Sequence, residues 1–234
     1  MTKVIKLVLA THNQHKTNEL KMIIDSVLGM RASDYIVSAE EMRLPDVEET
    51  ETSLQANAEL KATSVYKQTG LPSLADDSGL IIDLMGQAPG IFSARWSGTH
   101  GDDQANRRLV LNQLADIPLD KRTAHFETAC VLALPDANVS SKSTAKSHQP
   151  DSIIRPKSTS TSLSLRLVTS IGINAGKIID QEIGENGFGY DAIFVSDEFP
   201  DRTQAQLAVF EKNSISHRAR AVAGLFKELL TVFG

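Results

Sequence analysis

The sequence of 234 residues contains a single cysteine, Cys130, which excludes an internal disulfide and a cysteine-based zinc site. Cys130 lies in an alternating apolar run, and this pattern indicates a small buried side chain. No apolar run approaches the roughly 18 residues that a membrane-spanning helix needs. The short apolar run at the N-terminus is interrupted by Lys6, which is typical of a buried strand and not of a signal peptide. These absences favour a cytoplasmic protein with no membrane partner.

An excess of positive charge is also lacking. The chain has 24 Lys and Arg against 29 Asp and Glu, a formal net charge of −5. Non-specific nucleic-acid binding therefore has no electrostatic basis, and we expect no nucleic-acid partner. An anionic ligand would have to be held by local cations, backbone N–H groups or a metal ion.

Apolar residues recur at strand and helix spacings along most of the chain. The interleaving of strands and helices predicts an α/β fold built on a mixed sheet. The predicted elements are a strand at 4–10, a helix ending before Gly29, a helix that begins near Thr52 and ends before Gly70, two short strands within 73–84 hinged on an Asp-Asp-Ser-Gly turn, a helix at 102–114, strands at 124–134 and 165–173, and a last helix capped by Ser214 or Ser216.

Residues 138–164 break this pattern with nine Ser, three Thr and four Lys or Arg. Such a composition buries too little apolar surface to offset the entropy of ordering. We therefore predict a flexible insertion between two strands of one domain that spans 1–234, and not a boundary between domains.

A polar stretch, Thr11 to Lys16, lies where the first predicted strand feeds the first helix. Helix N-termini present unpaired N–H groups and partial positive charge, so they bind phosphate readily. Lys16 adds a cation, and Thr11 and Asn13 can donate hydrogen bonds. The Gly-x-x-x-x-Gly-Lys-Ser/Thr signature of a P-loop is absent. The alternative is an ordinary solvated loop with a helix cap.

Acidic residues gather at 46–51 and again at Asp76 and Asp77. Magnesium prefers carboxylate oxygens, usually one or two from the protein, with water and phosphate completing its shell. The pair at 76–77 follows one apolar run and precedes another, so at least one carboxylate should approach the sheet and need a partner or a metal ion. The alternative for the 46–51 cluster is a solvated charged loop.

Two further segments combine glycine, aromatic and basic residues. In 184–191 the glycines allow close backbone approach to a ligand, while Phe188 and Tyr190 could stack on a planar base. The alternative is a glycine-rich hairpin whose aromatics serve the core. In 212–218 cations cluster at a predicted helix start, which the helix dipole disfavours unless an anion is bound. The alternative there is an exposed basic turn.

Together these segments resemble the inosine/xanthosine triphosphate pyrophosphatases. The resemblance runs from Val4 to the last helix, apart from the insertion, and seven motifs in the same order make it specific. The motifs are Leu9–Lys16 with Glu19-Leu20, Glu48–Thr50, Asn57-Ala58 with Leu60–Ala62, Ala75–Leu80, Ala88–Arg95, Gly187–Asp191, and Lys212 with Ser216–Arg218.

The resemblance implies a long central mixed sheet, two lobes around a substrate cleft, a homodimer and a Mg²⁺ cofactor. It implies hydrolysis of non-standard purine nucleoside triphosphates (ITP, dITP, XTP) to the monophosphate and pyrophosphate. Matching the motifs residue by residue assigns the metal ligands to Glu49 and Asp77, the general base to Asp77 and a supporting role to Asp76. It assigns substrate binding to Thr11, His12, Asn13, Gln14, His15, Lys16, Ser78, Phe188, Gly189, Tyr190, Asp191, Lys212, His217 and Arg218.

Two departures from the family pattern remove no catalytic group: Ala56 stands where an acid is frequent, and Ala192 where proline is usual. Three alternatives stay open. They are a pyrophosphatase of related fold acting on modified pyrimidine or methylated nucleotides, a nucleotide-binding protein without turnover, and a phosphatase that releases orthophosphate. Retention of Asp76, Asp77, Glu49 and Lys16 together argues against the second.

Overall fold

The structure is a computed structural model that describes residues 4–136 and 164–234. The strands are β1 (Leu7–Leu9), β2 (Ile36–Ser38), β3 (Ser73–Ile82), β4 (Thr123–Pro135), β5 (Leu165–Ile178) and β6 (Phe194–Ser196). The α-helices are α1 (Gln14–Leu28), α2 (Leu54–Thr69), α3 (Asp103–Gln113), α4 (Val209–Ile215), α5 (His217–Gly224) and α6 (Phe226–Phe233). Among the residues described, no helix has the length and apolar character needed to cross a membrane.

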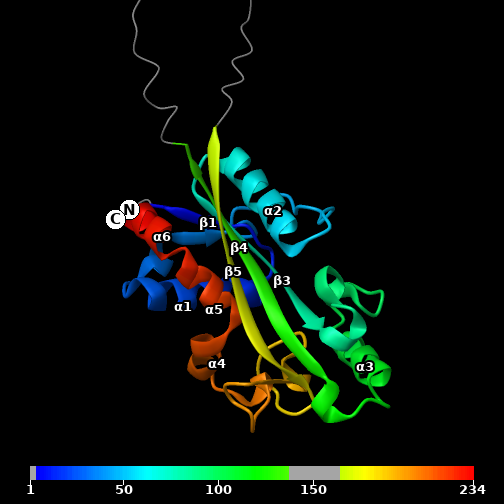
Figure 1. Cartoon of the computed structure of the whole chain (residues 1–234). Coiled ribbons are helices and arrows are strands. Elements are labelled where there is room, and N and C mark those ends of the chain that lie inside the picture. Colours follow the sequence, from blue (N-terminus) through cyan, green and yellow to red (C-terminus); the bar gives the residue numbers. More distant parts are fainter. Residues whose placement is uncertain (1–3, 137–163) are drawn as a thin grey trace, which may run out of the picture.

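All these strands form one six-stranded sheet in the order β2-β1-β3-β4-β5-β6. Strand β1 runs parallel to β2 and β3, whereas β3, β4, β5 and β6 pair antiparallel. The long β4 and β5 form the middle of the molecule (Figure 1). The predicted α/β fold with a long mixed sheet is confirmed.

Helices cover both faces of this sheet. On one face α1, α5 and α6 bury an apolar cluster against β1, β3 and β4, and on the other face α2 buries a second cluster (Figure 1). A third cluster lies toward the opposite end of the long strands, where α3 packs with the segment that leads into β6. The polar residues of the site lie between these clusters, in the middle of β3.

Local signals account for the helix boundaries. The Asn13 side chain accepts a hydrogen bond from the Lys16 N–H and begins α1, and Gly29 ends it in the left-handed conformation (φ 63°). Helix α2 is capped by the Ser53 side chain and not by Thr52, which corrects the predicted start by one residue. Either hydroxyl fits the local pattern, and Ser53 is the residue that reaches the N–H three positions ahead.

The acidic turn predicted at 76–79 is wrong. Strand β3 continues through it, with Asp76 opposite Cys130 and Asp77 opposite Ala129 on β4. The unbroken ladder with β4 overrides the local turn preference of Asp-Asp-Ser-Gly. Because successive side chains on a strand point to opposite faces, Asp76 and Asp77 lie on different faces of the sheet.

The C-terminal segment also differs from the prediction in detail. Ser216 caps α5, as one of the two expected candidates, but the single predicted helix is two, α5 and α6, separated at Leu225. The predicted insertion at 138–164 lies, apart from Ser164, outside the described residues. Its flanking strands are antiparallel neighbours, with Pro135 opposite Leu165.

Candidate active site

A cleft of about 1240 Å³ collects the predicted site residues from distant parts of the chain. Small-molecule sites typically measure roughly 300–1,000 Å³, so this cleft has room for an extended ligand. Every residue predicted to bind metal or substrate lines it except Gln14, whose amide instead donates to Asn18 at 3.0 Å. Asp76 lies behind the cleft wall and does not line it.

The phosphate-binding candidate, Thr11–Lys16, forms the N-terminal end of α1 at the cleft. Asn13 uses its side-chain oxygen as the helix cap, at 3.1 Å from the Lys16 nitrogen. His12 bonds the Leu44 carbonyl at 2.9 Å and approaches Asp46 at 3.1 Å, so it ties this loop to the acidic segment. The residues at the N-terminal end of α1 therefore line the same cleft as the acids.

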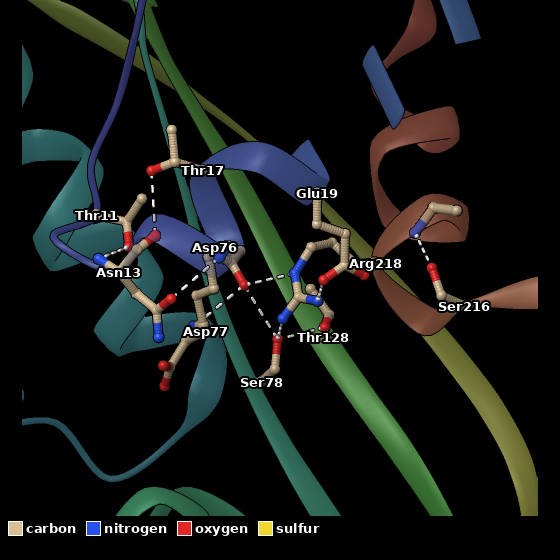
Figure 2. Close-up of polar contacts among 12 residues, drawn as sticks. Thr11, Asn13, Thr17, Glu19, Asp76, Asp77, Ser78, Thr128, Ser216 and Arg218 are labelled. Atoms are coloured by element: carbon tan, nitrogen blue, oxygen red, sulfur yellow. Dashed lines mark hydrogen bonds and ion pairs between the residues drawn. The ribbon is translucent and has the colours of Figure 1, made fainter. Parts of the chain in front are cut away.

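Asp76 is buried and forms ion pairs with two cations of the site, Lys16 and Arg218. Its Oδ2 accepts from Arg218 Nε at 3.0 Å and pairs with Lys16 Nζ at 3.3 Å. Figure 2 shows the Arg218 guanidinium between Asp76, Glu19 and Ser78. Burial alone would raise the pKa of Asp76, but Lys16 and Arg218 lower it far below the usual range. Asp76 thus stays ionised and positions two cations.

On the other face of β3, Asp77 and Glu49 share one ammonium. Lys61 Nζ lies 3.0 Å from Glu49 Oε1 and 3.0 Å from Asp77 Oδ1. Burial raises the pKa of Asp77, and the nearby Glu49 adds to this against the opposing effect of Lys61. The pKa of Glu49 is lowered, because Lys61 and Lys16 outweigh its burial. The environment therefore separates the two carboxyl groups into a more basic Asp77 and a more acidic Glu49.

Lys61 is a site residue to which the sequence reasoning assigned no role. It lies on α2 among apolar side chains and is 9% exposed. A lone lysine within the apolar stripe of a predicted helix is the signal that could have identified it, because a buried ammonium needs carboxylate partners. Arg95 also approaches Glu49, at 3.7 Å, from the 3₁₀ segment Gly90–Arg95.

The two aromatics predicted to stack on a base have different environments. The Phe188 ring borders the cleft with Lys212 Nζ 4.8 Å and the His15 ring 6.1 Å from its centroid. Tyr190 is 4% exposed, and its hydroxyl donates to the Ser93 carbonyl at 2.8 Å. The stacking role predicted for Tyr190 is therefore corrected: its ring serves the core, and Phe188 is the ring available to a ligand.

The basic residues predicted at 212–218 pair with carboxylates of the protein, and an anion bound beside them stays a prediction. Lys212 lies in the last turn of α4, where the helix dipole favours a cation, and pairs with Asp191 at 2.6 Å. Arg218 pairs with Glu19 at 2.9 Å. Burial lowers the pKa of His217 well below its ordinary value, and Arg218 and Lys212 lower it further. His217 is therefore neutral and packs on the Phe126 ring at 4.9 Å.

The acids fit a magnesium ion that binds together with a phosphate ligand. Among the described residues, no group of three or more His, Cys, Asp or Glu side chains could hold a metal ion. Glu49 and Asp77 are near enough to share Lys61, and each has a second carboxylate oxygen. Magnesium commonly takes one or two protein carboxylates and completes its shell with water and phosphate.

The mixed α/β fold has a cleft lined by acids, lysines and the N-terminal end of a helix, which are groups that suit a polyanionic small molecule. The chain belongs to the Ham1 family, whose sequence model matches residues 7–228. This confirms the resemblance seen in the motifs.

Proteins of known identity agree with this assignment over nearly the whole chain. A protein of Bifidobacterium longum subsp. infantis named dITP/XTP pyrophosphatase is 41% identical over 244 residues, covering 94% of this chain and 96% of that protein. A Streptomyces avermitilis protein of the same name is also 41% identical, covering 97% and 96%. The structure of a HAM1 protein from Coxiella burnetii is similar with a TM-score of 0.73 and 32% identity, covering 97% of this chain and all of that one (100%).

Proposed function

We propose that the protein hydrolyses non-standard purine nucleoside triphosphates, such as dITP, ITP and XTP, to the monophosphate and pyrophosphate. It is a nucleoside triphosphate pyrophosphatase, as its family and its relatives named dITP/XTP pyrophosphatase support. The observation that carries the proposal is that one cleft is lined by Asp77, Glu49, Lys16, Lys212 and Phe188. We propose that this cleft lies between two lobes, one carrying α1 and α2 and the other carrying α3.

Asp77 is the proposed general base. A good base has a pKa near the working pH, and pairs of carboxyl groups whose pKa values are pushed apart mark acid–base sites. Burial raises the pKa of Asp77, while Glu49 beside it is held ionised by Lys61. Asp77 would accept a proton from the water that attacks the α-phosphorus, and pyrophosphate would leave.

The triphosphate would be bound by the N-terminal end of α1 and by Lys16. Phosphoryl transfer requires positioning and charge neutralisation more than covalent catalysis, which suits this set of groups. Glu49 and Asp77 would hold the Mg²⁺ cofactor together with substrate oxygens. A bound magnesium ion supplies neutralisation of the charge on the phosphate oxygens. Asp76, which does not line the cleft, positions Lys16 through an ion pair of 3.3 Å between Oδ2 and Nζ.

The base would stack on Phe188, with Lys212 and Arg218 beside it. Hypoxanthine and xanthine carry a 6-oxo acceptor where adenine carries an amine. A donor aimed at that oxygen would leave adenine unpaired, and such discrimination can reach about 10⁴-fold. The Arg218 nitrogens bond to Asp76, Glu19 and Ser78, so only its remaining N–H groups could read a base.

Pyrophosphate release from a panel of nucleotides tests the proposal. We expect Mg²⁺-dependent release of pyrophosphate from ITP, dITP and XTP, with ATP much slower; guanine shares the 6-oxo group, so the rate with GTP measures discrimination at the 2-amine. Preference for dTTP, UTP or methylated pyrimidine nucleotides would identify the related pyrophosphatase instead. Release of orthophosphate would identify a phosphatase, and binding without turnover would identify a nucleotide-binding protein.

The Asp77→Asn variant tests the base directly. General-base catalysis contributes roughly 10²–10⁴-fold, so we expect kcat to fall at least that far. Binding of nucleotide should largely persist, because Lys16 and the end of α1 are unchanged. Turnover close to that of the wild type would refute the role of Asp77.

The homodimer implied by the family resemblance remains a proposal. Leu167, Ile171 and Ile173 point to one face of β5 and are 36%, 44% and 44% exposed. Exposed apolar patches of this kind mark interaction surfaces. Light scattering coupled to size exclusion should give twice the mass of the chain, and an Ile171→Glu variant should be a monomer. A wild-type monomer at micromolar concentration would contradict the proposal.

A further inference from the structure

Helix α3 holds the backbone of the loop that carries Phe188. Asp103 Oδ2 accepts the Gly189 N–H at 2.7 Å, and Arg107 Nη1 donates to the Gly189 carbonyl at 2.7 Å. Arg107 Nε in turn bonds Glu182 Oε2 at 2.8 Å. We call Asp103, Arg107 and Glu182 the Gly189 clamp. Both hydrogen-bonding groups of Gly189 are therefore engaged by side chains of α3.

These contacts explain Gly189 differently from the resemblance, which assigns it to substrate binding. Its N–H already has an acceptor, so it is a point where the loop is held and not a free donor toward a base. Gly189 takes the left-handed conformation (φ 60°), although a Cβ at this position would meet nothing within 4 Å. Residues with a side chain rarely adopt this φ value. A glycine is therefore needed here for the backbone conformation that directs the N–H and carbonyl of residue 189 toward α3.

The clamp completes the support of the Phe188 ring. On one side of Gly189, Tyr190 is buried in the core and its hydroxyl is bonded to Ser93. One residue further on, Asp191 bonds Lys212 at 2.6 Å and the Phe188 N–H at 2.9 Å. The Gly189 clamp adds a third attachment, to helix α3, for which the sequence predicted no role in the site. We expect this attachment to reduce the motion of the loop before a ligand binds.

We propose that Asp103 and Arg107 are positioning residues for base recognition, which set where the Phe188 ring lies in the cleft. This inference rests on the proposed function, because it assumes that the base stacks on Phe188. The bond from Arg107 to a peptide carbonyl is charge-assisted and so stronger than a neutral one. An ion pair as exposed as Arg107–Glu182 alone would contribute little. Preorganising a binding loop raises affinity by removing the ordering cost at binding.

Base recognition and phosphate binding can be measured separately with two ligands that each carry part of the substrate, called half-ligands here. Inosine monophosphate carries the base, and inorganic tripolyphosphate carries only the phosphates. For Arg107→Ala and Asp103→Ala, calorimetry should show a dissociation constant for inosine monophosphate raised on the order of tenfold, the loss expected for one or two charge-assisted hydrogen bonds. The dissociation constant for tripolyphosphate should stay within about twofold of wild type. Losing one such hydrogen bond would change it about tenfold, and the variants remove no bond near the phosphate-binding residues. In turnover assays KM for ITP should rise more than kcat falls.

The matched control is Arg108→Ala, which removes the same charge from the next residue of α3. Arg108 is exposed and makes no hydrogen bond or ion pair with the described residues, so both half-ligands should bind as they do to wild type. Asp103→Asn keeps an acceptor for the Gly189 N–H and should restore most of the affinity for inosine monophosphate. If Arg107→Ala does not fold, Arg107→Lys carries the test, because lysine cannot bond both acceptors as the planar guanidinium does; about a threefold loss is expected.

Unchanged affinity for inosine monophosphate in the clamp variants would overturn the inference, as would equal weakening of both half-ligands. Failure of the proposed function looks different. In that case wild-type protein would release no pyrophosphate from ITP, whatever the clamp variants do. The calorimetric comparison does not depend on turnover, so the two failures are distinguishable.

Discussion

The ammonium of Lys61 lies between Glu49 and Asp77, so a Lys61→Met variant removes the positive charge that the two carboxylates share. Methionine keeps a similar unbranched volume within the apolar surface of α2. The Lys61 side chain is 11% exposed, that of Asp77 8% and that of Glu49 26%. The variant therefore leaves the buried Asp77 carboxylate without Lys61, whereas the partly buried Glu49 keeps Arg95 at 3.7 Å.

The magnitude follows from the burial of the partners. Breaking a buried ion pair by removing one member typically costs about 3–5 kcal/mol. Glu49 is partly solvated and contributes less, so we expect the free energy of unfolding to fall by about 3 kcal/mol near pH 8. For a domain of this size each kcal/mol corresponds to roughly 2–4 °C, which gives a Tm about 6–12 °C lower.

The difference should depend on pH with a defined sign. Burial already raises the pKa of Asp77 in the presence of Lys61, and without Lys61 it should rise further. A carboxyl group with a raised pKa in the folded state binds protons more tightly when folded, so the stability of the variant increases as pH falls through that pKa. The deficit relative to wild type should therefore shrink from pH 8 toward pH 5.

Thermal unfolding at a series of pH values, with and without Mg²⁺, measures these effects. If Glu49 and Asp77 hold Mg²⁺ as proposed, added Mg²⁺ should raise the Tm of Lys61→Met more than that of wild type. Lys67→Met is the matched control, since Lys67 is exposed on the same helix. A Tm of Lys61→Met equal to that of wild-type protein at pH 8, or a deficit that grows as pH is lowered, would rule out this effect of Lys61.

Three further predictions concern positions outside the acid pair. A Gly172→Ala variant should lose about 1–3 kcal/mol of stability by denaturant titration, because its Cβ would lie 2.0 Å from the His217 carbonyl oxygen; wild-type stability would show that the backbone yields freely. Stability should fall as pH drops below about 6.5, since the lowered pKa of His217 keeps it neutral in the fold while the unfolded chain binds a proton, and a His217→Gln variant should lose that part of the pH slope. Replacing 138–164 by a short turn should leave activity intact, because the flanking ends of β4 and β5 are paired and do not line the cleft; loss of folding would contradict this.

Much of the fold could be predicted because its signals are local. The apolar spacing of α1, its Asn13 cap and its closing Gly29 lie within one short stretch of sequence. The alternation of β4 is similarly readable. The phosphate-binding candidate also follows from the order strand, polar loop, helix. A binding site that depends on one segment, such as Lys16 beside a helix N-terminus, can therefore be predicted without knowing which other segments pack against it.

The site itself depended on pairings between segments far apart in the chain. Pairing with β4, which begins more than 40 residues after Asp-Asp-Ser-Gly, decided that this segment is a strand and not a turn. Each residue of β3 has a partner on β4. That ladder placed Asp76 and Asp77 on opposite faces, where one anchors Arg218 and the other meets Lys61.

The sequence by itself determined helix α1 with its cap, the alternation of β4 and the residue types that suit a phosphate ligand, because hydrophobic period and capping act over a few residues. Only the tertiary structure decided which charge meets which. It paired Lys61 with Glu49 and Asp77, paired Lys212 with Asp191, and attached Gly189 to α3. Ion pairs and side-chain hydrogen bonds form at distances of about 3 Å, and separation along the chain carries no information about distances on that scale.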